Sequence, residues 1–139
     1  MSNGEVRITD PNTGGQKGSK LARFDLIPMD ALWEVAEVYG RGAEKYADRN
    51  WEKGYKWGLS VAALQRHLAL RLGGEVRDEE TGARHLAQVV WHALALLTFE
   101  LRGLGTDDVT RTKSPELSVT YVLLEERAQA YREWFEKAQ

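Results

Sequence analysis

The run Leu86 to Leu97, LAQVVWHALALL, decides the fold of this chain, because it is the most apolar stretch of the sequence. Apolar side chains, among them Val90, recur along it at intervals of three and four residues, which is the spacing of one face of an α-helix. The remaining faces are also largely apolar. Such a helix is buried on most sides, so we place it at the centre of a helix bundle.

The polar residues of this helix fall on one face, because His85, Gln88 and His92 are spaced i, i+3 and i+7. His85 and His92 lie two turns apart, which is roughly 10 Å along the helix axis. That separation is too long for both imidazoles to bind one metal ion. We therefore expect at least one of them to be a hydrogen-bonded histidine of the core.

Helical periodicity and end signals extend to three more segments. An apolar stripe that includes Leu32 and Tyr39 predicts a first helix, Ser60 is the expected N-cap of a second, and Ser114 with Pro115 marks the start of a fourth. The β-branched segment 118–122 can be helical or extended, and the sequence leaves this open. The four expected helices run from about Met29 to Ala47, from Ser60 to the Gly73–Gly74 break, from Thr81 to Gly103 or Gly105, and from Ser114 to the C-terminus.

These elements predict an all-α fold, a small bundle of about four helices. The chain has 139 residues, which is enough for one domain. Residues 1–20 are rich in glycine and poor in large apolar groups, and we expect a flexible arm there, followed by a single helical domain over 21–139. The fourth helix carries enough apolar surface to dock on a second copy, so we expect a homo-oligomer.

Composition excludes several classes of function. The net charge is −2, so no basic field or polybasic run points to nucleic acid or to an anionic membrane. No cysteine is present, which excludes disulfides, thiolate catalysis and cysteine-bound zinc. The N-terminus lacks the apolar core of a signal peptide, and the run from Leu86 to Leu97 is too short to span a bilayer. We expect a soluble, cytoplasmic protein.

The stretch Gly42 to Trp57, GAEKYADRNWEKGYKW, combines two tryptophans, two tyrosines and four basic residues in sixteen positions. Aromatic faces beside lysine and arginine suit a ligand made of a base and phosphates, since the rings stack on the base and the cations hold the phosphate oxygens. An aromatic connection that only caps the core is the alternative.

A second polar cluster, GGEVRDEETGARH, spans Gly73 to His85 and has four carboxylates within six positions: Glu75, Asp78, Glu79 and Glu80. Carboxylates this close repel one another unless water, basic groups or a cation intervene, and Mg²⁺ or Mn²⁺ is the natural hard partner. An ordinary acidic surface turn is the alternative.

Glu34 and Glu37 have ExxE spacing, which on a helix puts both carboxylates on one face, and Glu75 and Asp78 have ExxD spacing. Hydrolysis of a pyrophosphate bond needs carboxylates for metal ions, a base for water, and cations near the leaving group. Together the two motifs resemble the signature of MazG-like all-α nucleotide pyrophosphohydrolases. For the general base, Glu34, Glu37 and Glu80 all remain open.

A closer resemblance covers roughly residues 9–98. The strings TDPNTGGQKGSKLARFDLIP, GRGAEKYADRNWEKGY, ALQRHL, GGEVRDEETGARHL and WHALALL resemble the N-terminal domain of the phage-associated dATP/dGTP diphosphohydrolase family. The resemblance implies hydrolysis of a purine deoxynucleoside triphosphate to the monophosphate and pyrophosphate. It also implies a divalent cation, Mg²⁺ or Mn²⁺ with Co²⁺ as a third candidate. A role in phage nucleotide-pool metabolism, in the host cytoplasm, follows from the same resemblance.

The residue patterns and the resemblance together give a set of candidate roles. For phosphate contact we select basic residues, for purine stacking aromatic ones, and for the edge of the purine Asn50. His67 borders an apolar stripe, so we expect it to be a satisfied buried histidine. The metal candidates are Glu75, Asp78 and His85, with Glu34 and Glu37 as an alternative or second set; the phosphate candidates are Lys45, Arg49 and Arg66; the stacking candidates are Tyr46 and Trp51.

Two readings from other classes remain. One is a helical sensor or adaptor that binds a purine nucleotide without cleaving it. The other is an oligomerising helical module of a phage particle or replication complex, in which the acidic cluster is ordinary surface.

Overall fold

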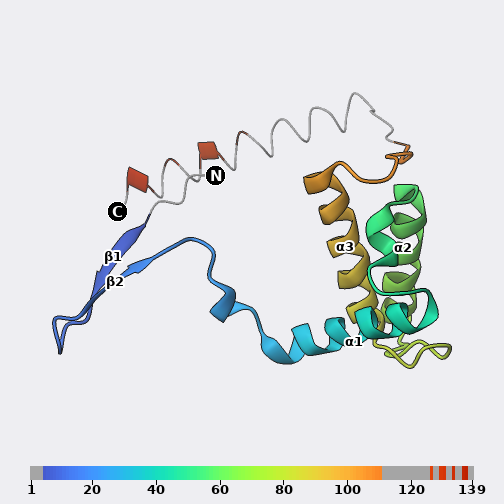
Figure 1. Cartoon of the computed structure of the whole chain (residues 1–139), viewed down its shortest axis with the longest axis horizontal. Coiled ribbons are helices and arrows are strands. Elements are labelled where there is room, and N and C mark those ends of the chain that lie inside the picture. The colour runs from blue at the N-terminus through green and yellow to red at the C-terminus, as the bar shows by residue number, and fades with distance from the viewer. Residues whose placement is uncertain (1–4, 111–125, 127–128, 131–132, 134–135, 138–139) are drawn as a thin grey trace. The chain divides into compact units, whose positions relative to one another are not determined.

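The computed structural model describes residues 5–110 and, further on, 126, 129–130, 133 and 136–137. Two short strands come first, and three α-helices follow, with a 3₁₀ turn before α1 and another before α2 (Figure 1). The elements are β1 (Val6–Thr9), β2 (Gln16–Ser19), η1 (Phe24–Leu26), α1 (Met29–Lys45), η2 (Asn50–Lys53), α2 (Trp57–Leu72) and α3 (His85–Arg102).

The helical part is built on the pair α2 and α3, which lie side by side and are joined by the loop 73–84 (Figure 1). Helix α1 lies across the end of this pair at which the loop connects them. The arginine Arg41 on α1 donates a hydrogen bond to the carbonyl of Thr81. A second link joins Glu34 on α1 to Arg84, at 3.7 Å between oxygen and nitrogen. These contacts fix the loop against α1.

The helix ends agree with the sequence where glycine marks them. Helix α2 ends at Leu72 before Gly73, and α3 ends at Arg102 before Gly103, which has the left-handed φ of 65°. Helix α1 begins at Met29 as predicted and ends two residues before the expected Ala47.

The predicted start of α2 is wrong. The helix begins at Trp57, whose N–H donates to the carbonyl of Thr106 at 3.0 Å. Ser60 is therefore inside the helix, and its buried hydroxyl contacts other side chains. Helix α3 begins at His85 and not near Thr81, because a backbone bridge between Arg77 and Arg84 holds the preceding residues in the loop.

The prediction of an all-α chain needs a correction, since part of the glycine-rich segment forms an antiparallel hairpin. Val6 pairs with Ser19 and Thr9 with Gln16. The turn is set by Asp10, whose carboxylate accepts the N–H groups of Asn12 and Thr13 at 2.9 and 2.8 Å. The described fold is mostly helical with one two-stranded sheet.

The core lies between α2 and α3 and is centred on Phe99, which is fully buried. Alanines at the interface, including Ala63, Ala87 and Ala95, are buried and let the helices approach closely. Directly after η2, Gly54 meets Gly105 so tightly that a β-carbon on Gly105 would lie 2.3 Å from the carbonyl oxygen of Tyr55. This contact joins the entry to α2 with the exit from α3.

The chain divides into two compact units, residues 1–107 and 108–139. In the second unit the described positions from 126 to 137 are helical, but the predicted start at Ser114 and the open segment 118–122 lie outside the described residues. The expected single domain over 21–139 stays a prediction. Within the described residues, no helix has the length and apolar character needed to cross a membrane.

Candidate functional site

A cleft of about 980 Å³ is enclosed by the second half of α1, the turn η2, helices α2 and α3, and the loop 73–84. Its volume is in the range of small-ligand sites. All six residues that the sequence selected for substrate contact line it: Lys45, Tyr46, Arg49, Asn50, Trp51 and Arg66. Two of the carboxylates from the acidic cluster, Asp78 and Glu80, also line it.

One wall of the cleft is aromatic. Trp51 lies 5.9 Å from the ring of Tyr39, 6.1 Å from that of Trp91 and 6.2 Å from that of Phe99, all centroid to centroid. Trp51 thus packs in the core and lines the cleft at the same time. Its position is compatible with both alternatives for the aromatic stretch, which were contact with a ligand and capping of the core. Tyr46 is different, because it is mostly exposed and has the amine of Lys45 5.3 Å from its ring centre.

The basic residues of the cleft are not equivalent. Arg49 is paired with Glu52 at 3.1 Å, and Glu52 is also approached by Arg102 at 3.4 Å. Lys45 and Arg66 make no ion pair with any residue that the structure describes. Both are exposed on their helices and line the cleft, so their charges are accessible from it.

Arg41 also lines the cleft and was not selected from the sequence. It holds the carbonyl of Thr81, so it links the cleft to the loop 73–84. The sequence contained a signal for this position, because Arg41 lies four residues before Lys45 and shares a face of α1 with it.

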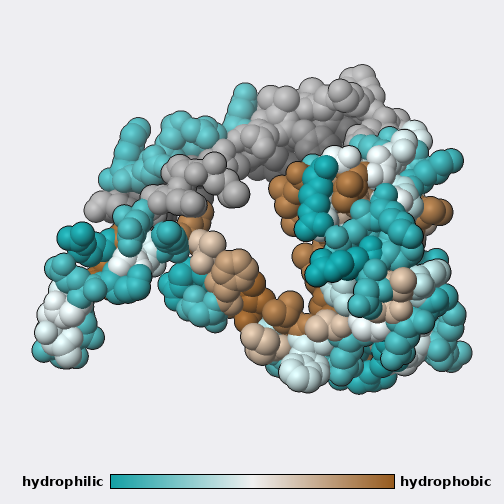
Figure 2. All heavy atoms as spheres, in the orientation of Figure 1, coloured by the Kyte–Doolittle hydropathy of each residue, from teal (hydrophilic) through white to brown (hydrophobic). Residues whose placement is uncertain are grey.

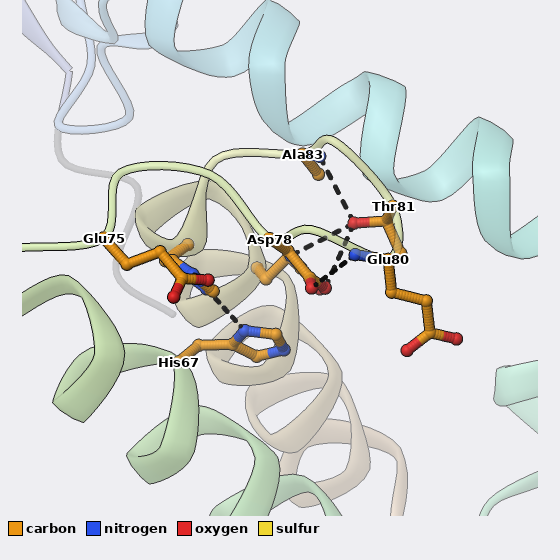
Figure 3. Close-up of polar contacts among 8 residues, drawn as sticks. His67, Glu75, Asp78, Glu80, Thr81 and Ala83 are labelled. Atoms are coloured by element: carbon orange, nitrogen blue, oxygen red, sulfur yellow. Dashed lines mark hydrogen bonds and ion pairs between the residues drawn. The ribbon is translucent and has the colours of Figure 1, made fainter.

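The loop 73–84 presents Asp78 through its own hydrogen bonds. The backbone of Asp78 pairs with Ala83 and Gly82 at 2.9 and 2.7 Å. One carboxylate oxygen accepts the N–H of Glu80 at 3.1 Å, and the other accepts bonds from Thr81 at 3.2 Å and Gln88 at 3.3 Å (Figure 3). Burial opposes ionisation of Asp78, but these bonds outweigh it and lower the pKa. Asp78 is therefore a carboxylate at neutral pH.

Two histidines behind Asp78 face each other. The Nδ1 atoms of His67 and His85 are 2.9 Å apart, and the other nitrogen of His85, Nε2, lies 2.8 Å from a carboxylate oxygen of Glu75. His67 is 5% exposed and His85 is fully buried. Burial lowers the pKa of His67, and the positive charge of Arg66 acts in the same direction. The expected buried and satisfied role of His67 is confirmed.

A second, partly buried series of hydrogen bonds joins three residues that line the cleft. The hydroxyl of Tyr55 lies 2.6 Å from that of Ser60, which lies 2.9 Å from Nδ1 of His92. Burial lowers the pKa of His92 to about 4, so its imidazole is neutral at pH 7. The sequence did not reveal these hydrogen bonds, because Ser60 was expected to be the N-cap of the second helix.

The remaining predicted carboxylates do not line the cleft. Glu34 pairs with Arg84, and Glu37 accepts the indole N–H of Trp33 at 3.2 Å. Glu75 and His85 lie beyond the lining residues and bond to each other. Within the described part of the chain, no three His, Asp or Glu side chains are placed to share one metal ion. The predicted metal ligands and general base stay predictions.

Comparison with known protein families shows which family the chain belongs to. Residues 11–109 match the family model described as dATP/dGTP diphosphohydrolase, N-terminal. The chain belongs to this family. The match covers both the aromatic and basic stretch and the loop 73–84, so the cleft of this dATP/dGTP diphosphohydrolase family member lies wholly within it. The closer of the two resemblances inferred from sequence is confirmed at the level of the dATP/dGTP diphosphohydrolase family, while its phage association and the MazG-like resemblance stay predictions. Neither the curated proteins nor the solved structures gave a match.

Proposed function

We propose that the cleft binds a purine deoxynucleoside triphosphate, dATP or dGTP, and hydrolyses it to the monophosphate and pyrophosphate with a divalent cation. Family membership supports the diphosphohydrolase class. The observation that carries the proposal is the combination, in one cleft, of aromatic rings, two cations that have no ion pair among the described residues, and the ionised Asp78.

The substrate contacts follow from the lining. Trp51 and Tyr46 offer ring faces for the purine, and Asn50, which has both donor and acceptor atoms, reads its edge. Lys45 and Arg66 hold the phosphate oxygens, since they have no carboxylate partner in the described chain.

The carboxylates of the cleft fit a cation that arrives with the triphosphate. Mg²⁺ is commonly held by one or two carboxylates, with water and substrate phosphates completing its shell. Asp78 supplies one such carboxylate, so that Glu80 does not have to bind the cation. Mg²⁺ or Mn²⁺ is the expected ion, with Co²⁺ as a third candidate, and when bound it neutralises phosphate oxygens and acidifies water.

Glu80 is our choice of general base, because Glu34 and Glu37 lie outside the lining of the cleft. The oxygen of a water molecule attacks the α-phosphorus while Glu80 accepts its proton. The bond from the α-phosphorus to the bridging oxygen breaks, and pyrophosphate leaves with the electron pair. Lys45 and Arg66 stabilise the charge that develops on this leaving group.

We extend the proposal to the biological setting. The sequence strings resemble phage-associated members of the family, which supports a role in phage nucleotide-pool metabolism within the host cytoplasm. The non-catalytic alternative, a nucleotide-binding adaptor, is favoured by one observation, which is that no three-ligand metal cluster exists among the described residues.

A matched pair of neighbours in the loop tests the function. Asp78 lines the cleft, whereas Glu79 is exposed and does not line it. We expect Asp78→Asn to lower turnover of dATP and dGTP about 100-fold or more while nucleotide binding persists. Glu79→Gln should leave both unchanged. Turnover is measured as released pyrophosphate, and binding by calorimetry.

Equal turnover in both variants and the parent chain would show that the chemistry is not in this cleft. Binding of dATP or dGTP by the parent chain, with no product in the presence of Mg²⁺ or Mn²⁺, would replace hydrolysis by the adaptor function.

A further inference from the structure

The buried pair His67 and His85 has no role in the chemistry described above. We propose that the Nδ1 atoms of His67 and His85 bind a divalent transition-metal ion, with Glu75 holding His85 in the tautomer that this requires. The inference rests on the proposed function only for what such an ion would do in hydrolysis. The binding itself rests on the geometry of three side chains from α2, the loop 73–84 and α3.

Glu75 sets the tautomer of His85. The carboxylate oxygen of Glu75 can only accept, so the Nε2 atom of His85, 2.8 Å away, carries the hydrogen. A neutral His85 then has its lone pair on Nδ1, and that lone pair points at His67. A carboxylate that accepts from the outer nitrogen of an imidazole is the usual arrangement behind a metal-binding histidine.

The lone pair of His85 meets Nδ1 of His67 at 2.9 Å. In the hydrogen-bonded state described here, a proton on His67 lies between the two nitrogens. A metal ion that replaces this proton would lie about 2.0–2.1 Å from each nitrogen, and two ligands of a tetrahedral ion are then about 3.3 Å apart. The pair needs to open by only about 0.4 Å to reach this spacing.

The surroundings of the two histidines favour a metal site in which some coordination positions are not filled by the protein. Both imidazoles are buried, yet His67 lines the cleft, so a shared ion has access to a bound triphosphate. Figure 3 shows Asp78 on the side of the loop that faces His67, and the charges of the two groups affect each other. The described chain supplies no third ligand already in place, so water and phosphate oxygens complete the shell.

Imidazole ligands also set the class of ion. Nitrogen ligands suit Zn²⁺, Co²⁺ and related ions, whereas Mg²⁺ prefers oxygen. The site is therefore distinct from Asp78, whose carboxylate suits Mg²⁺.

The test uses the full chain, freed of metal with a chelator and without nucleotide. Calorimetry with Co²⁺ or Zn²⁺ should show one ion per chain, with visible absorption bands for Co²⁺ and no displacement by Mg²⁺. His67→Asn and His85→Asn should abolish this binding, and Glu75→Gln should weaken it about 10- to 100-fold. His92→Asn is the matched control and should bind as the parent does, since His92 only stacks on the ring of His67, at 6.1 Å between centroids, while its Nδ1 atom bonds Ser60.

A second readout needs no variant. In weakly buffered solution at neutral pH the parent chain should bind the ion without releasing a proton from His67, because the hydrogen on Nδ1 of this neutral imidazole moves to its Nε2. Folded parent protein that binds neither ion, or binding that persists in both His67→Asn and His85→Asn, would overturn the site. Metal binding in a protein that hydrolyses no nucleotide would overturn the proposed function alone.

Discussion

Asp78 and Glu79 are neighbours in the chain with opposite surroundings. Three hydrogen bonds hold the carboxylate of Asp78 in the cleft, and they come from Glu80, Thr81 and Gln88. Glu79 is exposed and makes none that involve its side chain within the described residues. The donors keep Asp78 ionised although it is partly buried. This difference is why only one of the two is expected to matter for catalysis.

Burial of neutral His92 makes stability depend on pH. Its pKa is about 4 in the folded chain and 6.5 in its ordinary state, so between these values the unfolded chain binds a proton that the folded chain does not. The free energy of unfolding should therefore fall as the pH falls from 6.5 toward 4. The contribution of His92 to this fall is about 3 kcal/mol, from 1.36 kcal/mol per pKa unit.

Urea unfolding at a series of pH values, in the parent chain and in His92→Asn, measures this contribution. The variant should lose most of the slope below pH 6.5, although part remains because the pKa of His67 is also lowered. An identical slope in both proteins would contradict the assignment to His92.

At the residue scale, the structure brings together residues that the sequence selected because they lie close to one another in the chain. Lys45, Tyr46 and Trp51 lie close together in the sequence, and the cleft brings them to one surface. Sequence reasoning failed for Ser60, because its partners Tyr55 and His92 come from different elements and no local pattern marks them. Likewise, the pairing of His67 with His85 joins two helices and has no sequence signature.

At the scale of elements, the contact between Gly54 and Gly105 fixes how α2 begins and how α3 ends. A β-carbon on Gly105 would meet the carbonyl oxygen of Tyr55 at 2.3 Å, and its φ of 69° is left-handed. Gly103, two residues earlier, has a similar φ of 65° but nothing within 4 Å. Substitution of Gly103 thus tests backbone strain alone, whereas substitution of Gly105 tests backbone strain together with a steric clash.

We expect Gly103→Ala to cost about 1 kcal/mol of unfolding free energy, which is the cost of left-handed backbone alone. Gly105→Ala should cost at least about 2 kcal/mol more, because the backbone at Tyr55 must move. Thermal unfolding of the two variants checks this. Equal melting temperatures would show that the contact adds nothing to stability.

Helix positions were predictable because apolar spacing and terminal glycines are local signals, and the ends at Leu72 and Arg102 followed them. The start of α2 was not predictable, because it depends on a backbone hydrogen bond between Trp57 and Thr106, which are about fifty residues apart in the sequence. The hairpin was missed because its glycine content resembles that of a mobile arm. The turn residue Asp10 was the signal that pointed to it.

At the scale of the whole molecule, apolar side chains remain exposed along one face of α3 and in the segment that leads into α1 (Figure 2). On α3 they follow the spacing i, i+4, i+11 and i+15, at Leu86, Val90, Leu97 and Leu101. An apolar stripe of this kind commonly marks an interaction surface. It is consistent with the predicted homo-oligomer.

Light scattering after size-exclusion chromatography checks the oligomer. The parent chain should have a mass above the 15.7 kDa of one copy, and Leu97→Glu with Leu101→Glu should reduce it. The matched change is Leu72→Glu on α2, which is exposed but lies off this stripe and should keep the parent mass. A parent chain of single-copy mass would contradict the prediction.

The central claim is hydrolysis at the α-phosphorus in the cleft. Its most direct test is to incubate the purified chain with the eight common ribo- and deoxynucleoside triphosphates, in Mg²⁺ or Mn²⁺, and to separate the products by ion exchange. We predict monophosphate and pyrophosphate, without diphosphate, from dATP or dGTP and only when metal is present. Folded protein that yields no product from any triphosphate with either ion would contradict the account.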